Sequence, residues 1–262
     1  MYAPERHQAI LELAQSRGRV DVRDLAEQLQ VTPETIRRDL TTLERRGLLR
    51  RAHGGAIPIE RAALGHSVPE RETVMAAEKQ AIAAAALAEV PESGSILIDA
   101  GTTTIRLAEI LPTDRRLTVV TASLPVAMTL ASLPQIELHL LGGAVHGESL
   151  SGVGTWTHQM LGMVAVEVAF LSVSGITPER GLTTADLAES AVKSAMIRAA
   201  RRTVVLADHR KFGREEFSRI APLGAVDTII TDDAVNPELV AEVEAAGTEV
   251  VLAPLSVEAR TA

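Results

Sequence analysis

The chain contains no cysteine among its 262 residues, which excludes disulfides, thiolate metal sites and catalytic thiols. Aromatic residues make up only 2% of the sequence, so the core has to be built from alanine, valine, leucine and isoleucine. No apolar run approaches the ~20 residues that span a bilayer, and the first residues show no apolar signal segment. We therefore expect a cytoplasmic protein without a membrane partner.

Ligand-spaced histidines and internal repeats are also missing. The seven histidines are scattered along the chain, so we expect no metal site, and nothing in the sequence calls for a cofactor. The apolar content of 46% is sufficient for a sizeable core, and the length suits one large or two modest domains.

The segment 32–45 predicts a short amphipathic helix. Thr32 is a good N-cap, and Pro33 suits the first helical position because its missing N–H needs no partner there. Apolar residues recur at helical spacing on one face: Ile36, Leu40 and Leu43. The opposite face and its flanks carry Glu34, Thr35, Arg37, Arg38, Thr41, Thr42 and Arg45. Such a face suits the major groove of DNA, where arginine reaches guanine edges or phosphates and threonine reaches phosphates or a thymine methyl.

The flanking residues predict the rest of a winged helix-turn-helix. Asp21 can cap a preceding helix, and only Gln30 and Val31 remain for the turn between the two helices. Gly47 stops the second helix, and residues 48–56 read as a short basic hairpin in the position of a wing.

The alternative for these arginines is a solvated helix face, and the local charge argues against it. Residues 37–51 hold six arginines and two acids, a net of +4. Residues 1–57 hold 10 basic and 8 acidic residues (+2), and the remainder holds 16 and 26 (−10), which sums to −8. An acidic chain with arginines concentrated in one place has a local footprint for phosphates. The candidate DNA-binding residues are Thr32, Glu34, Thr35, Arg37, Arg38, Thr41, Arg45, Arg46, Arg50, Arg51 and His53.

The first quarter of the chain resembles the DNA-binding signature of DeoR-type bacterial transcription regulators. The resemblance is carried by Arg6, Ile10, Thr32, the run 35–40, Gly47-Leu48 and the run 53–56. One apolar position of that signature is Ala14 here, smaller than the usual leucine, which affects packing and not chemistry.

Beyond residue 57 the pattern changes. Residues 58–74 mix proline, glycine and charges, which predicts a linker between a DNA-binding domain at 1–57 and a second domain at 75–253. An alanine-rich helix is expected at 75–89. Short aliphatic or β-branched runs then alternate with helical segments at 103–111, 186–201 and 236–246; the runs are 96–100, 117–121, 136–141, 166–173, 203–207, 228–231 and 249–252. Alternation of this kind predicts an α/β fold with a Rossmann-like parallel sheet covered by helices.

The loop 99–104 follows the first of these strands and opens a helix. Gly101 lets the backbone turn, and the threonine hydroxyls, the unpaired N–H groups and the helix dipole together form an anion site. The alternative is that Thr102 only caps the helix, and the loop alone leaves both interpretations open.

Other strand ends favour a ligand at the same edge of the sheet, because ligands of open parallel sheets bind beyond the carboxyl ends of the strands. Several of those ends are small or polar, and Lys211 adds a cation. Glu189 and Lys193 lie four residues apart on one helix, which also fits a surface ion pair worth ~0.3–0.5 kcal/mol. The candidate effector-site residues are Asp99, Gly101, Thr102, Thr103, Thr104, Ser123, Gly142, Gly143, Gly175, Glu189, Lys193, Asp208 and Lys211.

These residues resemble the sensor domain of the same family over about 76–233, with gaps. That domain is similar in fold to ribose-5-phosphate isomerase, and the family generally responds to phosphorylated sugars. The resemblance implies that residues 101–104 hold the phosphate. The family usually has asparagine after the threonine of its second strand, where this chain has Ala122, which bears on one sugar-hydroxyl contact and on ligand choice.

The sequence therefore predicts a regulator, more a repressor than an activator, that binds operator DNA and is controlled by a phosphorylated sugar. A homo-oligomer, dimer or tetramer, is expected because two-fold related reading heads match repeated half-sites. The main alternative is an isomerase-like enzyme with a fused DNA-binding domain. Against it, the run 171–176 ends its strand without a carboxylate, and Glu189 as a base lacks partners. A dinucleotide enzyme is disfavoured because no G-x-G-x-x-G follows the first strand of the second domain.

Overall fold

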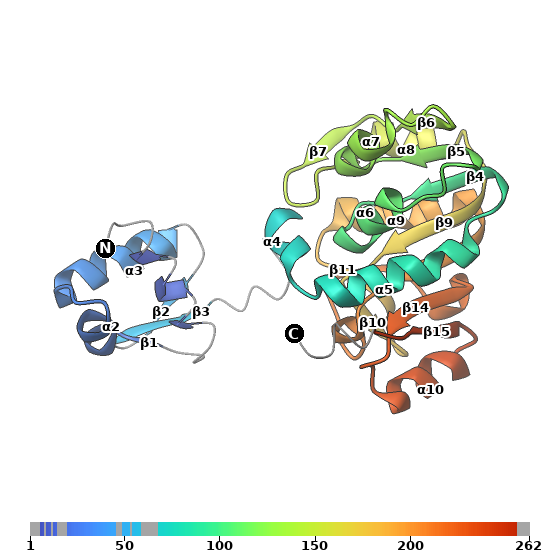
Figure 1. Ribbon diagram of the computed structural model, residues 1–262. Coiled ribbons are helices and arrows are strands. Elements are labelled where there is room, and N and C mark those ends of the chain that lie inside the picture. Colours follow the sequence, from blue (N-terminus) through green and yellow to red (C-terminus); the bar gives the residue numbers. More distant parts are fainter. Residues whose placement is uncertain are drawn as a thin grey trace. The chain divides into compact units, whose positions relative to one another are not determined.

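The computed structural model describes residues 6–7, 9–11, 13–14, 20–45, 49–52, 54–58 and 68–255 (Figure 1). The chain forms two compact units, Met1–Leu64 and Gly65–Ala262. Each unit has its own hydrophobic core. In the part of the chain that is described, no helix has the length and apolar character needed to cross a membrane.

The first unit is a winged helix-turn-helix, as the sequence predicts. Its elements are β1 (Val20–Asp21), α2 (Val22–Gln28), α3 (Pro33–Arg45), β2 (Leu49–Ala52) and β3 (Gly55–Pro58), with the strands in the antiparallel order β1-β3-β2. Its core contains side chains that are almost completely buried: Ile10, Ala14, Leu25, Ile36, Leu40, Leu43 and Leu49. Ala14 thus occupies a core position despite its small size.

The caps predicted for the two helices are present. The Asp21 carboxylate accepts a hydrogen bond from the backbone N–H of Arg23 (2.8 Å), and the Thr32 hydroxyl accepts one from that of Thr35 (3.2 Å). Gln30 lies between the helices with a φ of 54°, a left-handed conformation that ends α2 and turns the chain into α3. Local sequence signals are therefore sufficient to place α2 and α3.

A buried ion pair, which local signals do not indicate, ties the start of the chain to α3. Arg6 donates to the two carboxylate oxygens of Asp39 at 2.5 and 3.1 Å, and His7 lies 3.0 Å from the same group. Burial raises the pKa of Asp39, but hydrogen bonds and charge from Arg6 and His7 outweigh burial and leave the pKa below its ordinary value. Asp39 therefore helps to hold α3 in place and is not part of its exposed face.

The second unit is built on a seven-stranded, all-parallel sheet in the order β15-β14-β12-β9-β4-β5-β6. Its strands are β4 (Ser93–Ile98), β5 (Arg116–Thr121), β6 (Ile136–Leu140), β9 (Val166–Ser172), β12 (Ala200–Leu206), β14 (Thr228–Asp232) and β15 (Glu249–Ala253). Each of the seven predicted strands appears in this sheet, so the predicted α/β fold is confirmed.

Helices cover both faces of the sheet (Figure 1). They are α5 (Ala76–Ala86), α6 (Thr102–Glu109), α7 (Leu124–Leu130), α8 (Thr155–Leu161), α9 (Leu187–Ala199) and α10 (Pro237–Ala245), with short 3₁₀ turns at Leu87–Glu89, His209–Lys211 and Leu223–Ala225. Successive strand residues point to opposite faces, so Ile96 belongs to the core cluster that includes α5, α6 and α7, and Leu97 to the cluster that includes α8, α9 and α10. This two-sided burial explains why the strands are continuous apolar runs.

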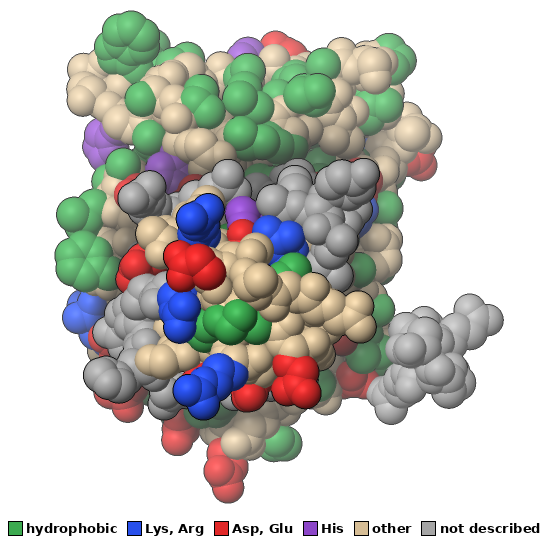
Figure 2. Space-filling view, turned by 90° about the vertical axis from the view of Figure 1, so that its left-hand side faces the viewer, with side chains coloured by type: hydrophobic (Ala, Val, Ile, Leu, Met, Phe, Trp, Pro, Cys, Tyr) green, Lys and Arg blue, Asp and Glu red, His purple; other side chains and the backbone are tan. Residues whose placement is uncertain are grey.

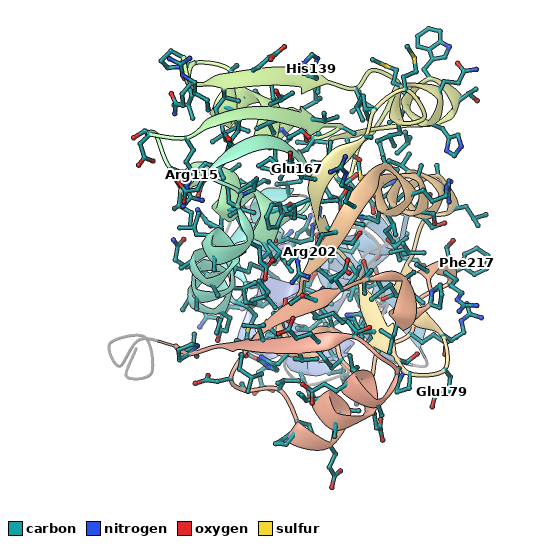
Figure 3. The ribbon with its side chains drawn as sticks, turned by 90° about the vertical axis from the view of Figure 1, so that its right-hand side faces the viewer. Arg115, His139, Glu167, Glu179, Arg202 and Phe217 are labelled. Atoms are coloured by element: carbon teal, nitrogen blue, oxygen red, sulfur yellow. The ribbon has the colours of Figure 1, made fainter. Side chains whose placement is uncertain are left out.

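Smaller strands lie outside the main sheet, and their pattern was too short to be recognised in the sequence. β10 (Gly175–Thr177), β11 (Gly181–Thr184) and β13 (Ser218–Ala221) form a second sheet, and β7 (Ala144–His146) pairs with β8 (Ser151–Val153). Near the amino end of β12, Arg202 forms an ion pair with Glu89 (2.8 Å; Arg202 is labelled in Figure 3).

Part of the interval expected as a linker, 58–74, is helical. α4 (Val68–Thr73) buries Val68 against the core of the second unit, and the Arg71 guanidinium donates to the backbone carbonyl of Glu148 (2.9 Å). Pro69 suits the first turn of a helix, which the linker interpretation of this stretch did not take into account. Residues 59–67 lie outside the described part.

The Arg6–Asp39 pair gives a stability prediction. Because Asp39→Asn leaves the buried Arg6 without a charged partner, we expect the local stability of α3 to fall by about 3 kcal/mol. Hydrogen exchange measured by mass spectrometry should then lose about a hundredfold of protection at the α3 amides. Since the folded pKa of Asp39 is lowered, its contribution is complete above the unfolded pKa of about 4 and disappears as the pH falls through the folded pKa.

The matched control is Asp24→Asn, which removes an exposed acid from α2 in the same unit. Equal protection of α3 in the Asp39→Asn variant and the parent would show that the ion pair does not hold this helix.

Candidate DNA interface and effector site

The exposed face of α3 presents the predicted arginines. The side chains of Arg37 and Arg38 are 56% and 82% exposed, and each lies near the Glu34 carboxylate, at 3.2 and 3.8 Å. A shallow hollow of about 390 Å³ runs along this face, lined by Glu34, Arg37, Arg38, Thr41 and Thr42. Figure 2 looks onto the first unit, where arginine side chains (blue) lie beside acidic ones (red). The surface offers guanidinium groups that a phosphate backbone can draw away from Glu34.

The threonine hydroxyls at the start of α3 and along it form hydrogen bonds within the helix. The hydroxyls of Thr41 and Thr42 donate to the carbonyls of Arg37 and Arg38 at 2.8 and 3.0 Å. Thr32 caps the helix, and its hydroxyl also lies 2.9 Å from that of Thr35. The hydroxyl hydrogens of Thr41 and Thr42 are therefore engaged, whereas one of the two hydroxyls of Thr32 and Thr35 keeps a hydrogen to donate.

The remaining predicted DNA contacts are only partly visible. Arg50 and Arg51 lie in β2, which pairs with β3 as the predicted wing hairpin. The side chains of Arg45, Arg50 and Arg51 lie outside the described part, as do Arg46 and His53 entirely. Their contacts with DNA stay predictions.

In the second unit, the loop after β4 leads into α6 as predicted. Gly101 is needed because a Cβ there would lie 2.4 Å from the Ser172 hydroxyl oxygen on β9. Thr102 and Thr103 follow as the first residues of α6, where backbone N–H groups lack helical partners. Thr104 has a structural role, because its buried hydroxyl donates to the carbonyls of Asp99 and Gly101 at 2.7 and 2.9 Å. The anion site expected here thus rests on the backbone and on the first two threonines.

Asp99 and Lys193 form a buried ion pair at the ends of β4 and β9. Lys193 donates to Asp99 and to the backbone carbonyl of Ser172 (2.9 Å). The N–H of Ser172 donates to the same Asp99 oxygen (3.0 Å). The interpretation of Glu189 and Lys193 as a mutual surface pair is therefore wrong, because Lys193 is buried and its charge is matched by a residue 94 positions away.

Glu189 has partners from other elements. The Glu189 carboxylate lies 3.4 Å from Nδ1 of His146 and 3.3 Å from the Thr184 hydroxyl. His146 is also 3.1 Å from the Ser149 hydroxyl, which lies 2.8 Å from that of Ser151. The expectation that Glu189 lacks partners is thus wrong. The loop around β7 and β8, which the sequence did not single out, closes this side of the site.

Cations gather around Asp208, after β12. Asp208 accepts from Arg210 (3.1 Å); burial raises its pKa, but nearby Lys211 and Arg210 outweigh burial and lower it. Burial lowers the pKa of Lys211, and Asp208 only partly offsets that effect. Burial likewise lowers the pKa of Lys79 to about 8, with Lys211, Arg210 and Arg71 adding to the effect. Positive charge here exceeds what one carboxylate balances.

Lys79 links this cluster to α4. Its ammonium group donates to the backbone carbonyls of Arg71 and Val74 at 2.5 and 2.7 Å, so α5 holds the end of α4. Both α4 and α5 pack against α6, the helix that opens with the threonine loop. The Nε atom of Arg71 is buried without a hydrogen-bond partner. Arg71 and Lys79 were missed because they fall in the expected linker and in an alanine-rich helix.

The other predicted effector residues have structural roles. Ser123 caps α7 by accepting from the N–H of Val126 (3.3 Å). The Gly142 carbonyl accepts from the Thr157 hydroxyl (2.7 Å), and Gly143 has a φ of 155° and sits where a Cβ would meet that hydroxyl. Gly175 lies buried in β10. None of these four residues is among those that line the cavity of the site.

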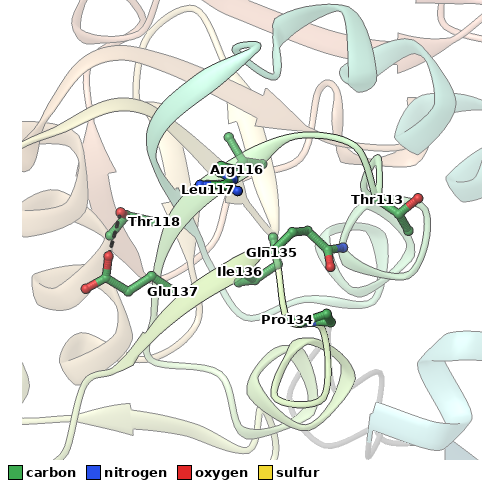
Figure 4. Close-up of a pocket in the computed structure, with 8 residues that line it drawn as sticks. All are labelled: Thr113, Arg116, Leu117, Thr118, Pro134, Gln135, Ile136 and Glu137. Carbon is green, nitrogen blue, oxygen red and sulfur yellow. Dashed lines mark hydrogen bonds between the residues drawn. The ribbon is translucent and has the colours of Figure 1, made fainter.

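The space at the centre of these residues is small. A cavity of about 10 Å³ is lined by Asp99, Ala100, Ala122, Ser151, Val153, Glu189, Val192, Lys193 and Met196. That is about the room of one water molecule, so a sugar requires the site to open. Ala122, where the family usually has asparagine, lines this cavity. A larger hollow of about 700 Å³ lies at the amino ends of β5 and β6 (Figure 4), the opposite end from the one at which open parallel sheets bind ligands.

Comparison with known families gives two matches. Residues 6–62 match the DeoR-like helix-turn-helix domain, and residues 74–233 match the DeoR C terminal sensor domain. A further comparison, with solved structures, finds ribose 5 phosphate isomerase A from Neisseria gonorrhoeae, 19% identical over 60% of this chain and 58% of that one, with a TM-score of 0.38. A similarity at that level carries no argument about function.

Several relatives match over nearly their whole length. An uncharacterized HTH-type transcriptional regulator of Bacillus subtilis, YulB, is 36% identical, covering 98% of this chain and 99% of that protein. The regulator GlpR of Haloferax volcanii is 34% identical over 96% and 98%. The glycerol-3-phosphate regulon repressor of Escherichia coli is 31% identical over 88% and 92%. With both domains matched in order and the relatives covered end to end, this chain belongs to the DeoR family of helix-turn-helix transcription regulators.

Proposed function

We propose that this chain is a repressor that binds operator DNA through α3 and is released by a phosphorylated sugar bound in its second unit. The observation that carries the proposal is the excess of positive charge around Asp208, at the carboxyl-end edge of the parallel sheet where α6 also begins, in a chain whose other unit exposes Arg37 and Arg38. Two relatives are named "Glycerol-3-phosphate regulon repressor" and "Putative aga operon transcriptional repressor".

The phosphate is assigned to the space between the α6 loop and the cation cluster. Backbone N–H groups at Gly101–Thr103 supply donors and the positive end of a helix dipole. Lys211 and Lys79 supply charge, and an anion would offset the burial and the neighbouring cations that lower the pKa of both lysines. Lysine suits this role because it acts as a point charge without a required plane.

The sugar is assigned to the side of Glu189, His146 and Asp99. Carboxylates and an imidazole are suitable partners for hydroxyl groups. Because the cavity between them holds about 10 Å³, a bound sugar has to displace α9 or the loop around β7 and β8. Binding is therefore coupled to a conformational change, and the effector favours the open arrangement by its differential affinity for it.

Coupling to DNA runs through α4. This helix is the first described element after the joining segment, and Lys79 holds it by two carbonyls. An anion that draws Lys79 and Arg71 toward itself changes the position of α4. We infer that this movement alters the placement of the DNA-binding unit, whose proposed extent is 1–57.

The proposal excludes catalysis. Proton transfer in an isomerase needs a carboxylate able to reach the substrate. The Asp99 carboxylate is bound by Lys193 and Ser172, and the Glu189 carboxylate by His146 and Thr184. We therefore assign both carboxylates to binding and not to proton transfer. The proposal includes a homo-oligomer in the cytoplasm. Binding to repeated operator half-sites requires paired DNA-binding units and access to the chromosome.

The DNA-binding role is tested with Arg37→Ala plus Arg38→Ala. Loss of a base contact should cost ~1–3 kcal/mol of operator affinity, and loss of a phosphate contact should reduce the salt slope by about 1 per contact. Fluorescence anisotropy with labelled operator at several salt concentrations measures both effects. Arg201→Ala plus Arg219→Ala, which removes two exposed arginines of the second unit, is the charge-matched control. Parent-like affinity and slope in the double variant would reject α3 as the reading helix.

The effector role is tested with Lys211→Ala, Arg71→Ala and Thr103→Ala. Each should bind operator like the parent without effector, and each should lose at least about tenfold in response to phosphosugars, since one charge or donor to the phosphate is removed. A panel of phosphorylated sugars, with the unphosphorylated sugars as controls, is titrated into the protein–operator complex. If Thr103 only caps α6, its loss costs at most ~1 kcal/mol of stability and leaves the response intact. Equal effector midpoints in the parent and all three variants would contradict this site.

A further inference from the structure

The second unit has an apolar edge that the effector site does not use. Ten large apolar side chains are exposed among the described residues, and six of them lie on or next to β6, β7, α7 and α8: Met128, Leu140, Val145, Trp156, Met160 and Met163. Figure 2 shows hydrophobic side chains gathered over this part of the molecule, at its top. We name this surface, together with strand β6, the β6 rim.

The α8 part of the rim has the pattern of a contact surface. Trp156 and Met160 are four residues apart and lie on one side of α8, and Met163 follows the C-cap Gly162 directly. Trp156 is the sole tryptophan of a chain poor in aromatics, and it is 72% exposed; Met163 is 84% exposed. Tryptophan and methionine are enriched in protein interfaces, and exposure of this kind in a monomer is unfavourable. The stripe is suited to burial against another protein.

The strand part of the rim is an open sheet edge. β6 pairs with β5 on one side and ends the sheet on the other. Such an edge presents unpaired N–H and C=O groups to any strand of matching register. Glu137 and His139 point to one face of β6 and lie 3.3 Å apart, and His139 is seen on this outermost strand in Figure 3.

The sequence of β6 is complementary to itself. It reads apolar, acid, apolar, histidine, apolar over Ile136–Leu140. If two copies pair antiparallel about Leu138, residue 137 of each lies opposite residue 139 of the other, and residue 136 lies opposite residue 140. Each Glu137 then meets a His139 whose ring N–H can donate to it, and apolar side chains meet apolar ones.

We propose that the β6 rim is the interface with a second copy of this chain, formed by antiparallel pairing of the two β6 strands about a two-fold axis and flanked by the apolar side chains of α7 and α8. This inference rests on the proposed function as an oligomeric regulator and specifies where the copies meet. A two-fold axis uses the same surface twice, as a self-complementary strand requires. The pairing joins the two sheets into one of fourteen strands.

The test uses the full-length protein and its single tryptophan. Sedimentation over a dilution series gives the dissociation constant, and Trp156 emission should shift to longer wavelength as the copies separate. We expect Met163→Glu to weaken association at least about tenfold, because a charge then enters the buried stripe. His139→Glu should also weaken it, by about threefold or more, since like charges then lie opposite each other.

Two further variants distinguish disruption of a specific interface from a general effect of added charge on association. Glu137→Lys combined with His139→Glu restores opposite charges across the pair and should recover parent association. Phe217→Lys, an equally exposed apolar site lying away from His139 (Figure 3), should leave association unchanged. The inference is overturned if the parent is monomeric throughout, if Met163→Glu associates like the parent, if Phe217→Lys weakens association as much, or if the swapped pair does not recover it.

Operator binding separates failure of this inference from failure of the proposed function. If the chain still forms an oligomer with every rim variant and still binds operator, the regulator proposal stands and the β6 rim is not the interface. If the chain forms the rim dimer but binds no operator at any concentration, the rim stands as an interface and the regulator proposal is rejected.

Discussion

Positive charge gathered at the carboxyl ends of the parallel strands is the constraint on which the arrangement of the second unit depends. Lys79 from α5 and Lys211 from the 3₁₀ turn after β12 are brought together around Asp208, and the pKa of each lysine is lowered by burial and by neighbouring cations. Such an arrangement costs folding free energy, and it persists because the carbonyls of Arg71 and Val74 and the Asp208 carboxylate hold it. An anion bound there would lower that cost, which is why we propose this place for the phosphate of the effector.

The two ends of the proposed effector site have different roles. We propose that the α6 loop and the lysines form an electrostatic end for a phosphate, whereas Glu189 and His146 form a hydrogen-bonding end for a sugar. Ala122 lines the cavity between them, so in the proposed site the remaining polar groups select the ligand. Because Lys79 holds the end of α4, the proposed coupling to the DNA-binding unit depends on the charge of the effector.

The sequence was informative wherever short-range rules decide structure. The caps at Asp21 and Thr32, the seven strands and the helices at α6, α9 and α10 follow from periodicity and turn chemistry. Pairings across long distances could not be inferred that way. Asp99 with Lys193 and Asp39 with Arg6 join residues far apart in the chain, and only the fold brings them together. Lys79 was hidden in an alanine-rich helix, and Arg71 in a stretch whose prolines and charges suggested a linker.

Reciprocal linkage tests the central claim most directly, because two coupled sites must alter each other's affinity by the same factor. The measurement is calorimetric titration of a responding phosphosugar into the free protein and into the protein–operator complex. We predict that operator weakens phosphosugar binding by the factor, on the order of 5–150, by which the sugar weakens operator binding. Equal phosphosugar affinity with and without operator would contradict the account, because the cation cluster would then be uncoupled from the recognition helix.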